Sequence, residues 1–150
     1  MRIALWLHLL ATVIWVGGMF FAHVALRPAA NALPPTVRIP LMIATLATFL
    51  RWVALAVVTL IVTGFLMIYG MGGFGHVGAS VHVMSALGLL MATIYGFIMA
   101  VPFPRARQAG EAAAWEVAGT ALGQVRKLVG INLVLGLVTL TVAILGHGVL

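Results

Sequence analysis

The run from Ile3 to Leu26 constrains the chain more than any other feature, because none of its 24 residues carries a formal charge at neutral pH. A helix rises ~1.5 Å per residue, so this run spans ~36 Å and can cross a hydrocarbon core of about 30 Å. The run nevertheless holds His8 and His23. A polar ring inside a membrane is costly unless it meets a partner, so both histidines are candidates for function.

The composition extends this prediction to the whole chain. Of 150 residues, 64% are hydrophobic and only 7% are charged, with a mean hydropathy of +1.23. These values exclude a water-soluble domain and predict a polytopic membrane protein. The net charge of +6 is spread over segments between apolar runs, which argues against nucleic acid as a partner.

Four membrane spans are expected, at about 3–26, 50–69, 79–101 and 128–147, in a single domain of residues 1–150. Prolines end the first and third spans. Residues 36–49 are expected to form a short interfacial helix, and residues 109–124 a surface helix rich in alanine. The predicted fold class is all-α: an up-down bundle of four transmembrane helices in the lipid bilayer.

The basic side chains predict the orientation of this bundle. Seven of the eight Lys and Arg residues lie in or beside the first and third loops, and only Arg2 lies on the other side. By the positive-inside rule those two loops are cytoplasmic. Both termini are therefore expected outside, in a bacterial inner membrane.

Three histidines on three different spans then reach a similar depth in the outer leaflet. At ~1.5 Å per residue, His8 lies ~9 Å, His82 ~12 Å and His147 ~13 Å beyond the middle of its span. Met84 lies near this level, and His76 lies above it in the second loop. His23 lies at the opposite end.

Each of these residues also has a purely structural interpretation. His147 is close to the chain end and suits the lipid headgroups, and His76 suits an ordinary loop. Methionines commonly fill apolar space. His8 and His82 are harder to explain in this way because each lies within a span.

Two cofactors fit a histidine cluster in a chain that has no cysteine. Heme b needs two axial imidazoles from facing helices, here His8 and His82, with the small residues Ala11 and Ser85 leaving room beside the ring. Copper suits a mixed set of His and Met ligands, here His8, His82, His147 and Met84. The residues alone leave this choice open.

Several motifs resemble one family. His8, the Trp15–Gly18 run WVGG and the pair Arg27–Pro28 resemble the first helix of the copper resistance D (CopD) family. The runs YGMGG at 69–73, VHVM at 81–84 and RKLVGINL at 126–133 resemble later parts of its short, four-helix members. The resemblance implies an inner-membrane protein linked to copper handling. A more distant similarity is to the HemJ-type protoporphyrinogen oxidases, which carry a lysine where this chain has His82.

The first hypothesis for the function is that this membrane protein binds heme b through His8 and His82 for electron transfer or membrane redox chemistry. The alternatives are copper binding or transport through the same cluster, and an accessory membrane protein without a cofactor. A heme-dependent oxidoreductase is open, but no catalytic residue is assigned. A redox partner, a quinone and a homo-oligomer also remain open.

Overall fold

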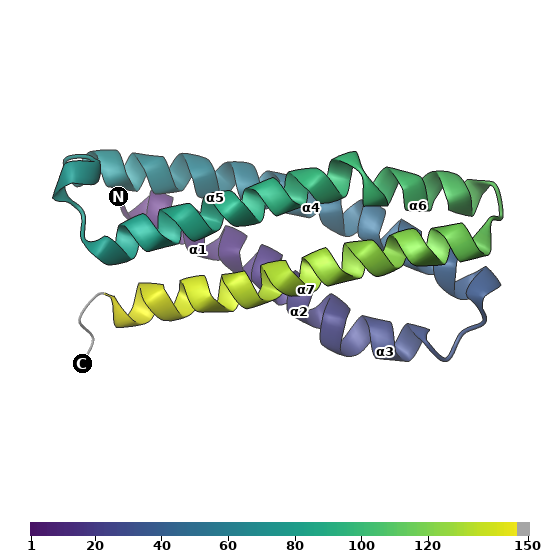
Figure 1. Cartoon of the computed structure of the whole chain (residues 1–150). Coiled ribbons are helices and arrows are strands. Elements are labelled where there is room, and N and C mark those ends of the chain that lie inside the picture. Colours follow the sequence, from purple (N-terminus) through teal and green to yellow (C-terminus); the bar gives the residue numbers. More distant parts are fainter. Residues whose placement is uncertain (147–150) are drawn as a thin grey trace.

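The computed structural model describes residues 1–146 as four long helical rods that run up and down beside one another (Figure 1). No strand is present in this described part of the chain. Each rod is long and apolar enough to cross a membrane; their ranges are Arg2–Ala30, Pro35–Gly70, Ala79–Glu111 and Trp115–Leu145. The predicted all-α fold with four membrane-spanning helices is confirmed.

The two ends of the bundle hold different segments of the chain. At one end lie the N-terminus, the turn after α4 (Pro35–Gly70) and the end of α7 (Trp115–Leu145) (Figure 1). The Ser80 hydroxyl lies 3.5 Å from the backbone oxygen of Gly146 at this end. We call this end of the bundle the histidine end, because His76 and His82 lie there. The other end holds the loop at 31–34 and the turn at 112–114, and we call it the arginine end.

The first rod is one continuous helix with two π-helical turns. Its segments are α1 (Arg2–Thr12), η1 (Val13–Gly17), α2 (Gly18–Phe21), η2 (Ala22–Leu26) and α3 (Arg27–Ala30). A π-helical turn accommodates one extra residue and so changes the direction in which the following side chains point. The second such turn contains His23 and directly precedes Arg27.

Helix α4 joins two segments that the sequence suggested were separate. Residues 36–49, expected as an interfacial helix of their own, are continuous with the second span. Pro34 is extended, with φ −62° and ψ 151°, and Pro35 takes a first-turn position that needs no backbone N–H. Pro40 lies inside the helix but does not end it. A helix of this length spans ~54 Å, so α4 extends beyond a hydrocarbon core of about 30 Å.

The third rod bends, and the predicted surface helix at 109–124 is wrong as a single element. Helix α5 (Ala79–Ala100) meets α6 (Pro102–Glu111) at Val101, where the backbone leaves the helical region. A turn at Ala113, with φ 55°, then separates α6 from α7. Residues 109–124 are therefore divided between the end of α6 and the start of α7.

The rods pack in pairs around a shared core. Helix α1 packs on α4, while α5 and α6 pack on α7. In the middle of the bundle Trp15 and Tyr95 meet edge to face with their ring centroids 6.5 Å apart, and the Tyr95 hydroxyl donates to the Leu50 carbonyl at 3.0 Å. Many large apolar side chains face outward, including Phe20, Phe65 and Val134. Such faces suit lipid rather than water.

Candidate functional site

His8 is the candidate with the most specific surroundings. Its Nδ1 atom lies 2.8 Å from Oγ1 of Thr63, a residue buried on α4. Gly64 lies next to this contact, and a Cβ atom there would sit 3.6 Å from Cε1 of His8. The imidazole is half-buried where α1 packs on α4. The membrane-embedded histidine thus has the polar partner that its position requires.

The hydrogen bonds of Thr63 indicate which ring nitrogen carries the proton. The Thr63 hydroxyl donates to the backbone oxygen of Thr59 at 2.6 Å. A hydroxyl has only one hydrogen, so a Thr63 hydroxyl that donates to Thr59 accepts from Nδ1–H of His8, and we assign the ring proton to Nδ1 on this basis. In a neutral imidazole the other nitrogen, Nε2, then keeps its lone pair. A histidine fixed in this way by its second nitrogen has the arrangement that metal-ligating histidines usually show.

His82 lies at the histidine end but in a different setting. It is exposed near the start of α5, and its ring packs on Phe74 with centroids 5.6 Å apart. Phe74 belongs to the short helix η3 (Phe74–His76) and also meets Phe65 of α4. His82 therefore has an aromatic neighbour from the turn after α4, whereas His8 has a polar neighbour within α4.

The other predicted ligands at this end fall into three situations. His76 is exposed, and its Nδ1 atom lies 2.8 Å from the Gly72 carbonyl within the same turn. Met84 is half-buried on α5. His147 lies outside the described residues. Within residues 1–146, no three His or acidic side chains are grouped closely enough to hold a metal ion. The metal set of His8, His82, His147 and Met84 stays a prediction.

Asn132 is the most deeply buried polar side chain of the core. Its Nδ2 atom donates to the Met91 carbonyl at 3.1 Å and so links α7 to α5. Its Oδ1 atom has no partner among the described residues. Gly136, one turn further along α7, lies against Val16 and Met91. The centre of the bundle is thus held by close packing with a few hydrogen bonds, and it contains no ionisable pair in the described chain.

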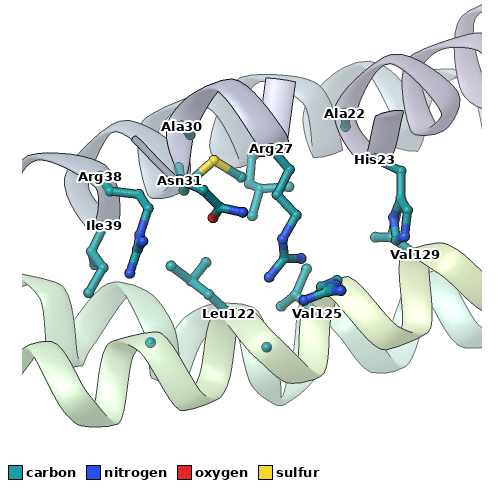
Figure 2. Close-up of a pocket in the computed structure, with 15 residues that line it drawn as sticks. Ala22, His23, Arg27, Ala30, Asn31, Arg38, Ile39, Leu122, Val125 and Val129 are labelled. Atoms are coloured by element: carbon teal, nitrogen blue, oxygen red, sulfur yellow. The ribbon is translucent and has the colours of Figure 1, made fainter. Parts of the chain in front are cut away.

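A basic cavity at the arginine end was not anticipated from the sequence. It measures about 170 Å³ and lies between the first rod, the start of α4 and α7. Arg27, Arg38 and Arg126 line it, together with His23 and Asn31. Figure 2 shows Arg27 and Arg38 pointing across this space toward the side of α7 that carries Leu122 and Val125. We call it the arginine cavity.

In the sequence these arginines indicate only the orientation of the bundle. Arg27 and Arg38 are 11 residues apart and Arg126 is far away along the chain, so no local spacing connects them. The one available signal was that the sequence contains only two acidic residues, Glu111 and Glu116, to neutralise eight basic ones.

Comparison with known proteins gives the family. Residues 43–145, more than half of the chain, match the family model described as copper resistance protein D. This region includes His82, Met84 and Asn132, and His8 precedes it. No curated protein and no solved structure matches the chain. With four helices suited to spanning a membrane, the chain is a multi-pass membrane protein that belongs to the copper resistance protein D family.

Proposed function

We propose that this protein binds copper at the histidine end of the bundle and that His8 is the anchoring ligand. The observation that carries the proposal is the 2.8 Å contact between Nδ1 of His8 and the Thr63 hydroxyl. With the proton assigned to Nδ1, Nε2 of this membrane-embedded imidazole keeps a free lone pair. Because the family is one of copper resistance, copper is the metal that we expect Nε2 of His8 to bind.

Further ligands come from the same end of the molecule. His82 and Met84 lie on the first two turns of α5, and His147 follows the end of α7 in the sequence. Imidazole and thioether groups together suit reduced copper, and the chain has no thiol that could compete. We propose that these residues complete a site with His8 when copper binds.

The proposed orientation places this site toward the cell exterior. All basic residues of the described chain except Arg2 lie nearer to the arginine end than to the histidine end. By the positive-inside rule the arginine end is cytoplasmic. We propose a bacterial inner membrane in which both termini and the copper site face outward.

Heme b is the second candidate, and the same observation favours it. An axial imidazole needs a free Nε2 and a fixed ring, which His8 has through Thr63. His82 would supply the second axial nitrogen from α5. Heme would add electron transfer to the chemistry of the bundle, whereas copper would be handled as cargo.

One set of measurements separates the two candidates. The protein is purified from cells grown with added copper, and its visible spectrum and metal content are measured beside those of His8→Ala. We expect bound copper without a Soret band, and its loss in His8→Ala. A Soret band that changes in His8→Ala would establish the heme alternative. Metal content and a spectrum that are unchanged in His8→Ala would contradict both.

A further inference from the structure

We propose that the arginine cavity binds the phosphate group of an anionic phospholipid at the edge of the membrane. This site lies at the end of the bundle opposite His8 and is independent of the proposed copper function.

Three positive charges converge on the cavity, and no acidic side chain of residues 1–146 lines it. The Arg27 guanidinium interacts electrostatically with both Arg126 and Arg38. In the described part of the chain the one ion pair joins Arg107 to Glu111, at 3.1 Å on the exposed face of α6. Like charges held together repel one another, so this arrangement favours an anion that all three can contact.

The cavity lies at the level where lipid phosphates are found. Counting about 20 residues from the histidine end, as a span of about 30 Å requires, reaches Arg51 on α4, Val101 after α5 and Arg126 on α7. On the first rod the same count reaches Ala22, and Arg27 lies about five residues further along, where it lines the same cavity as Arg126. These positions mark the far edge of the hydrocarbon core. The arginine cavity begins near this edge and extends outward to Arg38, which lies 13 residues before Arg51 on α4.

An apolar groove continues from the cavity along α7. A second cavity of about 440 Å³ shares His23 and Arg126 with the first and is also lined by Ile131, Val134 and Leu135. Val134 is 61% exposed, so this side of α7 is not covered by another helix. A phospholipid carries both a phosphate for the cavity and acyl chains for the apolar groove, whereas a free phosphate has no apolar part that could occupy the groove.

The local backbone lets the first rod approach α7 closely beside the groove. Gly130 faces His23, and a Cβ atom there would lie 3.1 Å from Cε1 of that imidazole. His23 lies in the π-helical turn Ala22–Leu26 and Arg27 directly follows it, and both line the cavity together with residues of α7. Guanidinium groups bind phosphate oxygens through paired, charge-assisted hydrogen bonds, and basic pockets between transmembrane helices are typical sites for anionic headgroups.

Native mass spectrometry of the full chain in detergent tests this proposal. Phosphatidylglycerol and phosphatidylcholine with identical acyl chains are added to the wild type, to R27Q/R126Q and to R105Q. Arg105 is exposed at the same end but does not line the cavity, so R105Q removes one charge without changing the site. We expect the wild type and R105Q to retain phosphatidylglycerol over phosphatidylcholine, and R27Q/R126Q to bind it roughly tenfold more weakly.

Two results would overturn the proposal: equal retention of phosphatidylglycerol by R27Q/R126Q, or an equal loss in R105Q. A third arm adds millimolar inorganic phosphate, and displacement of the lipid by phosphate would show that the site serves a soluble anion instead. If R27Q/R126Q does not fold, R126Q alone decides, because Arg126 is exposed on α7 and its replacement leaves the core intact. Circular dichroism confirms the helix content of each variant.

Discussion

The Nδ1 atom of His8 and the Oγ1 atom of Thr63 lie 2.8 Å apart, and this contact joins the first rod to α4 across 55 residues of sequence. Thr63 in turn donates to the Thr59 carbonyl, so the three groups form a directed chain from imidazole to hydroxyl to backbone. The contact with Thr63 thus fixes the His8 ring through Nδ1 and leaves Nε2 available to bind copper.

Removing the Thr63 hydroxyl tests the role of this chain. Thr63→Val keeps the shape of the side chain but removes the acceptor that fixes Nδ1–H of His8. We expect copper affinity to fall roughly tenfold, because second-shell partners of histidine ligands commonly have effects of this size. Copper(I) titration against a competing chelator measures the change. Thr59→Val is the control, since it removes a hydroxyl that donates to the Leu55 carbonyl and has no hydrogen bond to His8 in the described structure. An unchanged affinity in Thr63→Val would show that the contact does not support the site.

Gly17 and Gly18 give a matched test of helix packing. The ring of Phe49 occupies the space beside Gly18 that a Cβ atom would need, whereas nothing lies within 4 Å of such an atom at Gly17. Gly18→Ala should therefore lower the melting temperature, because the Phe49 ring must move. Gly17→Ala should leave it unchanged or raise it slightly, since alanine favours a helix by up to about 1 kcal/mol. Thermal unfolding in detergent compares the two. Equal effects would contradict the described approach of the first rod to α4.

Tyr95 connects the two packed pairs of rods through two different interactions. Tyr95→Phe removes the hydrogen bond to the Leu50 carbonyl but keeps the ring against Trp15. We expect a loss of about 0.5–1.5 kcal/mol in the free energy of unfolding. Tyr95→Ala also removes the ring and should cost about 3 kcal/mol or more. Chemical unfolding followed by Trp fluorescence measures both. A loss in Tyr95→Phe as large as that in Tyr95→Ala would mean that the hydroxyl, and not the ring, dominates.

The distribution of basic residues predicts the orientation directly. A reporter that is active only in the cytoplasm is fused after Leu150, and a second fusion is made in the turn at 112–114. We expect activity only from the second, because seven of the eight basic residues lie toward the arginine end. Activity from the Leu150 fusion would contradict this orientation and would mean that the proposed copper site faces the cytoplasm.

The sequence predicted the four helices well because long apolar runs are strong signals in themselves. It failed where one residue decides between continuation and a turn. Pro40 suggested a break but lies within α4, and Ala113 adopts a left-handed conformation that its residue type does not indicate. The π-helical turns have no residue signature either. These local features decide where the helices bend and which side chains face one another.

The candidate site shows the same division. His8 stood out because a histidine within an apolar span needs a partner, but the identity of Thr63 required the packing of α1 on α4. The arginine cavity was invisible for a related reason, because its three arginines come from the first rod, α4 and α7. Charge counting located them at one end of the bundle but could not show that they line one cavity.

Copper(I) affinity of the wild type, His8→Ala and His23→Ala tests the central claim most directly. His23 is the matched control, since it is a half-buried imidazole of the same rod that lies at the arginine end. The three proteins are titrated in detergent against a chromophoric copper(I) chelator. The account predicts that His8→Ala loses at least about tenfold in affinity, as expected for the removal of a ligand, while His23→Ala matches the wild type. Equal affinities for all three proteins, or a loss confined to His23→Ala, would contradict it.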